Sequence, residues 1–310
     1  MSLEISLQED LNLSSQGLDA EKAFQGDMVI YGHMPPNSQL LKWVGNKQKF
    51  APFICSKIGR FNRYFEPFLG SGAVLGHVAP KIGYASDAYK PLIDIWQTLS
   101  SSPKLVIKWY SDRYKLLKEV GHKEGYEMIK RDFNNSPNGA DLLFISRSCY
   151  GGVIRFRKRD GYLSTPCGIH KPIKPDSFSR RVWIWHERVK NTQFEALDYR
   201  EAIEKAGEGD LIYCDPPYIH SQAILYGGQD FRFSELVKCL EMAIHRGAKV
   251  ALSIDGIKKS GKENCHVDFS SKIFPTEISI PMGASMLKRF QRLGENCVDE
   301  HVDDRLLLSW

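Results

Sequence analysis

The chain has 310 residues, 42% of them hydrophobic, and a formal net charge of +5, which is the composition of an ordinary globular protein with room for one large domain. It contains no run of about 18 apolar residues and no basic-then-apolar segment of the signal-peptide kind, so we expect a soluble, cytoplasmic protein without a membrane partner. Seven scattered cysteines without a C-x-x-C pair, together with nine dispersed histidines, argue against a disulfide framework and against a bound metal.

The first 30 residues have the character of a loosely held acidic tail. They contain six acidic residues and one lysine, with serine, glutamine and glycine spacers and little periodicity. We assign no function to residues 1–30.

Alternating strand-like and helix-like runs begin near residue 63. The pattern predicts strand 63–68, helix 73–78, strand 82–87 and helix 91–99. Strands that alternate with helices across short turns indicate a parallel sheet with helices on its faces.

A glycine turn joins the first strand to the first helix, in the sequence Phe65-Glu66-Pro67-Phe68-Leu69-Gly70-Ser71-Gly72. Glycines let the backbone turn tightly and approach a ligand closely, although a lone G-x-G is more often a simple turn. Asp87 ends the next strand, where an acid can accept both hydroxyls of a ribose. The full G-x-G-x-x-G signature is absent because Leu75 stands at its third glycine, which disfavours NAD and leaves a nucleoside without a pyrophosphate, such as S-adenosylmethionine.

Residues 102–191 differ from their surroundings and are interpreted as an insertion. They begin with predicted helices 103–120, 123–134 and 140–150 and continue through a segment rich in glycine, arginine and aromatic residues. Residues 101–190 contain 19 Lys and Arg against 9 Asp and Glu, whereas the rest of the chain is net acidic. A basic segment beside an acidic remainder indicates contact with a polyanion, and the alternative is a solvated basic face.

The α/β rhythm returns after residue 192. The predicted elements are strand 193–198, helix 199–206, strand 210–214, helix 234–246, strand 249–255, and a final antiparallel pair at 272–280 and 305–310. Residues 31–101 and 192–310 are therefore expected to form one α/β domain, into which residues 102–191 are inserted.

The tetrapeptide Asp215-Pro216-Pro217-Tyr218 follows the apolar strand 210–214. A carboxylate and a carbonyl oxygen at a strand end can accept hydrogen bonds from an exocyclic amino group, and a tyrosine can stack on the attached ring. Such a slot fits an adenine or a cytosine. The alternative is that two prolines after a strand merely mark a loop.

Taken together, these motifs resemble the Dam-type (D12 class) adenine-N6 DNA methyltransferases in order and spacing. The resemblance covers about residues 40–310 and rests on L-K-W-V-G-N-K at 41–47, F-E-P-F-L-G-S-G, Asp87, F-E-A-L-D-Y-R at 194–200 and D-P-P-Y. It extends into the insertion at 144–156 and 161–168. It implies a Rossmann-like S-adenosylmethionine-dependent methyltransferase sheet, with a mainly helical, basic DNA-recognition insertion that contains a β-hairpin.

The resemblance also implies site residues. Those expected at S-adenosylmethionine are Trp43, Lys47, Glu66, Phe68, Gly70, Gly72, Asp87, Asp198 and Asp215. Asp198 would bind the adenine amino group of the cofactor, although a lone Asp at a strand end is usually a helix cap. The catalytic segment would be Asp215, Pro216, Pro217 and Tyr218, in which Asp215 and the Pro216 carbonyl orient the target nitrogen and Tyr218 stacks on the flipped base.

In the insertion, the resemblance implies DNA contacts at Tyr150, Val153, Arg155, Arg157 and Pro166. Tyr150 and Val153 match intercalating and thymine-contacting positions, Arg155 matches a guanine-reading arginine, and Arg157 is expected at phosphate or on the hairpin surface. Asn46, Gly151 and a longer interval between Arg155 and Pro166 depart from the family pattern. GATC is therefore only the default target.

The expected function is transfer of a methyl group from S-adenosylmethionine to N6 of an adenine flipped out of double-stranded DNA. The alternatives are an N4-cytosine DNA methyltransferase, which Asp at 215 and the motif order disfavour, and a silent DNA-binding protein on the same fold. A protein-glutamine methyltransferase would be expected to have Asn at 215 and no basic insertion. A cognate restriction enzyme is a candidate partner, and the sequence indicates no oligomeric state.

Overall fold

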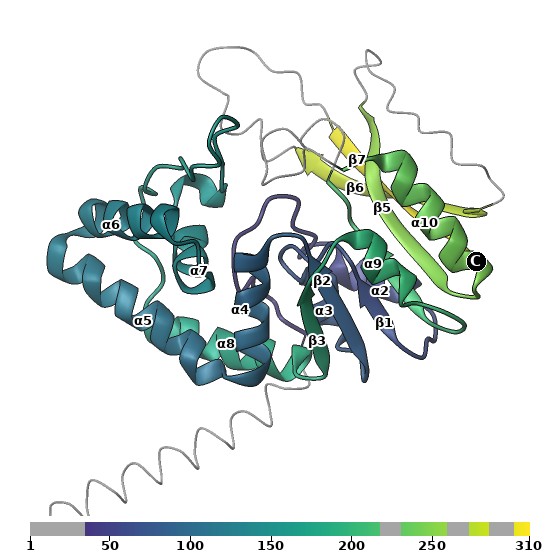
Figure 1. The fold of residues 1–310 in the computed structure, drawn as a ribbon, viewed down its shortest axis with the longest axis horizontal. Helices are drawn as coiled ribbons and strands as arrows, with labels where there is room; N and C mark the ends of the chain where they lie inside the picture. Colours follow the sequence, from purple (N-terminus) through teal and green to yellow (C-terminus); the bar gives the residue numbers. More distant parts are fainter. Residues whose placement is uncertain (1–34, 218–230, 259–272, 285–300) are drawn as a thin grey trace, which may run out of the picture.

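The computed structural model describes residues 35–217, 231–258, 273–284 and 301–310, and their centre is a seven-stranded sheet of order β3-β2-β1-β4-β5-β7-β6 (Figure 1). The strands are β1 (Tyr64–Glu66), β2 (Gly83–Asp87), β3 (Thr192–Ala196), β4 (Leu211–Cys214), β5 (Lys249–Lys258), β6 (Thr276–Ala284) and β7 (His301–Leu308). Strands β1 to β5 pair in parallel, and β7 runs antiparallel between β5 and β6. The predicted Rossmann-like sheet and its antiparallel final pair are confirmed.

Helices occupy the connections between the strands. They are α2 (Ala51–Lys57), α3 (Ala73–Val78), α4 (Lys90–Ser101), α5 (Pro103–Val120), α6 (His122–Asn135), α7 (Gly139–Ser148), the 3₁₀ turn η1 (Tyr150–Gly152), α8 (Pro175–Val189), α9 (Tyr199–Glu204) and α10 (Phe233–His245). Proline lies in the first turn of α4, α5 and α8, where its missing N–H costs no intrahelical hydrogen bond. Neither α2 nor α8 was predicted from the sequence. Among the described residues, no helix has the length and apolar character needed to cross a membrane.

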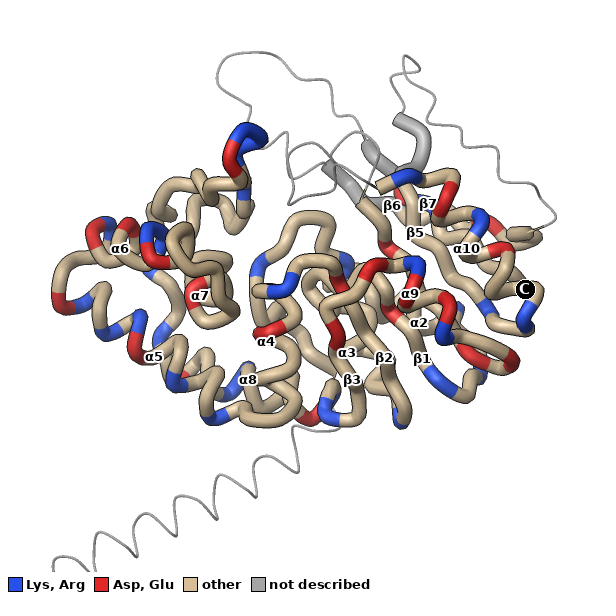
Figure 2. Tube along the Cα trace, in the orientation of Figure 1, with Lys and Arg blue, Asp and Glu red and all other residues tan. Residues whose placement is uncertain are grey.

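Helices α5, α6 and α7 form a lobe beside the sheet, and α4 and α8 lie between this lobe and β3 (Figure 1). Figure 2 shows Lys and Arg recurring along α5, and acidic residues lie between them. On this helix Lys108 pairs with Asp112 and Lys115 with Glu119, each at i,i+4 spacing. Part of the basic charge of the insertion is therefore balanced on α5 itself.

The predicted β-hairpin of the insertion is present only in rudimentary form. Residues 149–168 fold back antiparallel, but their pairing consists of two isolated bridges, Cys149 with Cys167 and Phe156 with Leu163. No strand is formed within this segment, all of which the structure describes. Glycine-rich sequence and positive φ angles at Gly151 and Gly152 interrupt the extended backbone that a ladder requires. The prediction of a β-hairpin was therefore wrong about strand formation, but the predicted reversal of chain direction is present.

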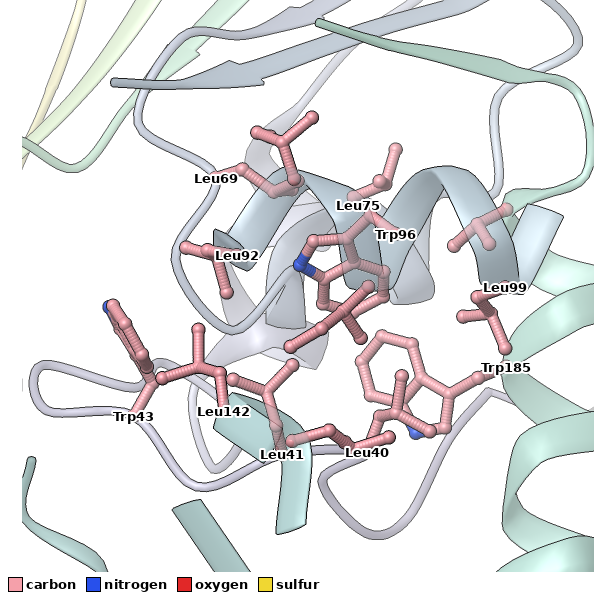
Figure 3. Packing of buried hydrophobic residues seen from close by; sticks show 14 of the residues in the cluster. Leu40, Leu41, Trp43, Leu69, Leu75, Leu92, Trp96, Leu99, Leu142 and Trp185 are labelled. Carbon is pink, nitrogen blue, oxygen red and sulfur yellow. The ribbon is translucent and has the colours of Figure 1, made fainter. Parts of the chain in front are cut away.

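The lobe and the sheet share one continuous hydrophobic core, part of which is shown in Figure 3. The rings of Trp96 in α4 and Trp185 in α8 are both fully buried, with centroids 5.5 Å apart. Trp185 donates a hydrogen bond from Nε1 to the carbonyl oxygen of Ser38 at 2.8 Å. Burial of these two large side chains against each other joins α8, the last helix of the insertion, to the core beneath the sheet. The domain division at residues 101 and 191 stays a prediction.

Candidate active site

The carboxyl ends of neighbouring parallel strands bring several predicted site residues to one edge of the sheet. Strand β1 ends at Glu66 and β2 at Asp87, and β4 is followed directly by Asp215. The chain runs outward from β1 to β2 and β3 and then crosses to β4 on the other side of β1. Ligands of open α/β sheets bind in the crevice outside the strand ends at such a change of direction. This edge is therefore the candidate active site.

The glycine turn after β1 has the backbone geometry that its sequence predicts. Gly70 and Gly72 have φ angles of 48° and 61°, in the left-handed region where L side chains are strained. A Cβ atom at Gly72 would lie 2.8 Å from the ring of Trp96, and one at Gly70 would lie 3.1 Å from Cδ1 of Trp43. The turn is packed against Trp96 and Trp43, so glycine is favoured at both positions.

Asp87 is buried at the end of β2, and its carboxylate holds the glycine turn in place. Its two oxygens accept hydrogen bonds from the backbone N–H groups of Gly70 and Tyr89, each at 3.1 Å. Burial raises the pKa of Asp87 to about 6, although both N–H donors act to lower it. Each carboxylate oxygen has a second lone pair, so Asp87 can accept further hydrogen bonds from ligand hydroxyls while it fixes the turn.

Lys47 and Asp215, which are 168 positions apart in the chain, form a largely buried ion pair. The Lys47 Nζ atom lies 2.8 and 2.9 Å from the two carboxylate oxygens of Asp215 and 3.6 Å from Oδ2 of Asp304. The side chains of Lys47 and Asp304 are each 3% exposed, whereas that of Asp215 is 19% exposed. One ammonium group therefore holds two carboxylates, of which Asp215 is the one accessible to a ligand.

Asp304 is a site residue that sequence reasoning missed. It lies in β7 opposite Asp255 of β5, which places it at the carboxyl end of the parallel strands. The predicted terminal strand began at Arg305, one residue too late to include it. The sequence did contain a signal for this residue, because Asp304 is an acid at the start of an otherwise apolar strand. A carboxylate buried in such a strand requires a partner.

Glu66 is buried at the end of β1, close enough to Asp215 for the two charges to interact. Burial, together with the charge of Asp215, raises the pKa of Glu66 to about 8, although the hydrogen bond from the Tyr64 hydroxyl acts to lower it. That hydroxyl donates a hydrogen bond to Oε2 of Glu66 at 2.6 Å. A protonated Glu66 limits the negative charge around Lys47, because Asp215 and Asp304 already share this ammonium.

Glu66→Gln should flatten the dependence of folding stability on pH. The folded-state pKa of about 8 lies above the ordinary value of 4.5, so the folded protein retains a proton that the unfolded chain releases between these values. The resulting stabilisation is fully present below pH 4.5 and is lost as the pH rises to about 8. Urea unfolding at a series of pH values checks this, and a Glu66→Gln profile as steep as that of the wild type would contradict it. Glu195→Gln, at an exposed position of β3, should keep the wild-type profile.

Phe68 and Asp198 lie on the α9 side of the site. The ring of Phe68 stacks on Tyr199 with centroids 5.3 Å apart and meets the edge of Phe231 at 5.8 Å. Asp198 caps α9 by accepting a hydrogen bond from the backbone N–H of Arg200 at 2.9 Å, and it pairs with the Arg200 guanidinium at 2.7 Å. The Arg200 hydrogen bond lowers the pKa of Asp198. The structure therefore shows Asp198 as a helix cap, and the contact of Asp198 with the cofactor stays a prediction.

The residues around Asp215 in the D-P-P-Y segment follow the end of β4. Cys214 is fully buried, and burial raises its pKa well above the usual value, which disfavours the thiolate that a nucleophile needs. Pro216 is buried and Pro217 half-buried, and neither lies in a strand, as expected for residues without an N–H group for the ladder. Tyr218 lies outside the described residues, so its stacking role stays a prediction.

The residues predicted to contact DNA all lie in the segment 149–168 of the insertion and not at the strand edge. Tyr150 is 43% exposed, and Arg155 and Pro166 are also exposed. Val153 is only 8% exposed, which leaves little of its side chain for a thymine methyl group. The exposed residues have the access that base contacts require, and all four DNA roles stay predictions.

Arg157 makes contacts within the insertion. Its guanidinium lies 4.1 Å from the centroid of the Tyr162 ring, within the range of a cation–π contact. It also lies 3.2 Å from the carboxylate of Asp160. These contacts agree with the expected position on the hairpin surface and leave phosphate binding by Arg157 a prediction.

Comparison with known proteins gives several relatives of this chain. It is 29% identical to the DNA N-6-adenine-methyltransferase of Escherichia phage P1 over 229 residues, which are 70% of this chain and 30% of that protein. It is 28% identical to the DNA adenine methylase of Serratia marcescens over 189 residues, 60% of this chain and 68% of that protein. It is 27% identical to the type II methyltransferase M.MjaIII of Methanocaldococcus jannaschii over 262 residues, 76% of this chain and 86% of that protein. The chain thus spans less than a third of the phage P1 protein.

The family model for the D12 class N6 adenine-specific DNA methyltransferases matches residues 43–277. The match begins at Trp43, beside the glycine turn, and includes every element from α2 to α10. It therefore spans the strand edge at which Lys47 meets Asp215 and the whole of the basic insertion. The chain belongs to the D12 class N6 adenine-specific DNA methyltransferase family.

Proposed function

We propose that the chain transfers a methyl group from S-adenosylmethionine to the N6 nitrogen of an adenine in duplex DNA. The observation that carries the proposal is the partly exposed carboxylate of Asp215, held by the ammonium of Lys47 next to the glycine turn and Asp87. Family membership and the printed names of the phage P1 and Serratia marcescens relatives support the same reaction.

The glycine turn fits the proposed cofactor. When bound, S-adenosylmethionine would supply an electrophilic methyl group on a sulfonium. Gly70 and Gly72 allow the tight turn at the strand edge, the carboxylate of Asp87 can accept ribose hydroxyls, and Trp43 borders the turn. Glu66 and Phe68 line the same edge of the sheet and complete the expected cofactor set with Lys47 and Asp198.

Asp215 performs the central step of the proposed mechanism. The lone pair of the adenine N6 is delocalised into the ring, which makes this nitrogen a poor nucleophile. The Asp215 carboxylate and the Pro216 carbonyl would each accept a hydrogen bond from the amino group, which favours a nitrogen lone pair directed at the methyl donor. Lys47 holds the carboxylate in place through contacts of 2.8 and 2.9 Å, and no covalent intermediate with the protein is needed.

The insertion would bind the DNA. A base inside a duplex has to be flipped out before the Asp215 carboxylate can reach its amino group, at a cost of a few kcal/mol. Tyr218 is the proposed stacking partner of that base, and the segment 149–168 is the proposed reader of its neighbours, with GATC as the default site. Surface Lys and Arg of the insertion would contact phosphate.

The proposed reaction is tested by incubating the protein with labelled S-adenosylmethionine and duplex DNA of mixed sequence, followed by digestion and separation of the nucleosides. We expect label in N6-methyladenine. Label in N4-methylcytosine alone would favour the cytosine alternative, and an absence of labelled nucleoside alongside measurable DNA binding would favour a silent DNA-binding protein.

Arg155→Ala should relax discrimination at one guanine of the target site. An arginine that binds the O6 and N7 atoms of guanine contributes about 1–3 kcal/mol against the wrong base, and the side chain of Arg155 is exposed. The kcat/KM values on duplexes with single base-pair changes measure this effect. If the variant loses activity equally on all duplexes, Arg155 contacts phosphate instead.

A further inference from the structure

Two of the residues proposed to read DNA bases, Val153 and Arg155, belong to a short segment, Gly152 to Phe156, that is held at both ends by residues adjacent to the candidate cofactor site. The first anchor is Gly152, whose φ of 68° would strain any L side chain at this position. A Cβ atom there would lie 2.5 Å from Cδ of Lys42, so the Gly152 backbone rests on the stem of the residue that precedes Trp43.

The second anchor is an aromatic contact at the other end of the segment. The ring of Phe156 meets the ring of Tyr89 edge to face, with centroids 5.6 Å apart and an interplanar angle of 68°. Tyr89 in turn lies 6.4 Å from the ring of Trp43, and its backbone N–H binds the carboxylate of Asp87. Tyr89 thus connects the base-reading segment to two residues of the candidate cofactor site.

Between the anchors, the main chain of Arg155 is fixed while its side chain projects into solvent. Its backbone N–H donates to Oγ1 of Thr165 at 2.8 Å, and its carbonyl oxygen accepts from the backbone N–H of Ser164 at 2.9 Å. Thr165 Oγ1 also donates to the carbonyl oxygen of Val153 at 2.9 Å. These hydrogen bonds make the segment locally rigid, so its two anchors determine where Arg155 lies relative to the strand edge.

We infer that Tyr89 is a positioning residue for target discrimination, which acts through Phe156 on Arg155. This inference rests on the proposed function, because it gives Tyr89 a part in the choice of DNA site. A bidentate arginine–guanine contact requires a fixed geometry, and a displacement of the guanidinium by about 1 Å weakens such a contact strongly. Shortening Tyr89 removes the ring against which Phe156 is held and lets the segment shift.

The test compares Tyr89→Leu, Tyr89→Phe, Arg155→Ala and the double variant Tyr89→Leu/Arg155→Ala. The readout is the ratio of kcat/KM on the preferred duplex to that on a duplex with its guanine–cytosine pair replaced, at saturating S-adenosylmethionine. We expect Tyr89→Leu to lower this ratio by about tenfold, within the 5–150-fold range of typical couplings between sites, and Tyr89→Phe to preserve it. In the Arg155→Ala background, Tyr89→Leu should cause no further loss, because both changes remove the same contact.

Tyr114→Leu is the matched control, since Tyr114 stacks on Tyr110 in α5 away from both anchors. It should leave the ratio unchanged. An unchanged ratio in Tyr89→Leu, additive losses in the double variant, or an unchanged ratio in Arg155→Ala would each overturn the inference. A purely structural Tyr89 would lower stability and activity on both duplexes equally.

Equilibrium binding of the same variants to the same two duplexes gives the discrimination ratio without methyl transfer. If the wild type binds with discrimination but forms no N6-methyladenine, the proposed function fails, while the effect of Tyr89→Leu on the binding ratio still decides the inference. If methyl transfer occurs and the ratio does not depend on Tyr89, the inference fails alone.

Discussion

Replacing Asp215 with Asn is expected to reduce methyl transfer by about 10²–10³-fold, because the variant loses the charged acceptor aimed at the target amine. An Asn side chain has nearly the same shape, but its NH₂ group donates hydrogen bonds and would face both the target amine and the Lys47 ammonium. Single-turnover rates with saturating DNA and S-adenosylmethionine measure the chemical step, and circular dichroism checks the fold. Wild-type single-turnover rates in a folded variant would remove Asp215 from its proposed role.

Asp210→Asn is the matched control for this experiment. Asp210 is a buried acid just before the opposite end of β4, where it pairs with Arg63 and accepts from the backbone N–H of Gly207. The same substitution there should lower the free energy of unfolding without affecting the rate per folded molecule. The contrast separates loss of a buried carboxylate from loss of the catalytic one.

Replacing Lys47 with Met should have the second large effect, on both stability and activity. The change keeps a long apolar stem but removes the ammonium that lies 2.8 Å from Asp215 and 3.6 Å from Asp304. Removing one partner of a buried ion pair typically costs about 3–5 kcal/mol, because the remaining charge stays in a poorly solvated position. Urea unfolding measures the loss of stability, and single-turnover rates should fall because the Asp215 carboxylate loses the ammonium that holds it in place.

A second variant separates the two carboxylates. Asp304→Asn in the Lys47→Met background removes one buried charge, so the double variant should regain part of the lost stability but not the lost activity. If Lys47→Met unfolds at the wild-type urea concentration, the ion pair contributes little and Lys47 has no structural part at this edge. Recovery of activity in the double variant would indicate that Asp304, and not Lys47, controls Asp215.

Local sequence signals predicted most elements of the fold. Helix α5 was predicted with the bounds that the structure gives, because Pro103 marks its first turn and Gly121 follows its last residue. Helix α8 was missed although Phe178, Val182, Trp185 and Val189 follow a helical repeat and are all buried. Its many arginines and aromatic residues were interpreted as a DNA-binding segment, and that compositional signal outweighed the periodicity.

The arrangement of the site was less accessible to local reasoning. The proximity of Lys47 to Asp215 spans 168 positions, and it was expected only because the resemblance places both at the cofactor. The contacts of Asp304 with Lys47 and of Phe156 with Tyr89 depend on tertiary packing between distant segments, which neither propensity nor periodicity encodes. The role of Asp198, by contrast, was accessible to local reasoning. Its position after a strand predicted the helix cap that the structure contains.

The shared tryptophan core has a consequence for how target specificity can change in this protein. A Cβ atom at Gly76 of α3 would lie 2.6 Å from the ring of Trp185, so α8 is fitted closely to the first helix after the glycine turn. An insertion joined in this way cannot be exchanged between relatives as a self-contained cassette, because a foreign α8 would bring a surface unmatched to α3 and α4. New specificities should therefore arise by substitution of the exposed residues Tyr150, Arg155 and Pro166, which can vary without disturbing the core.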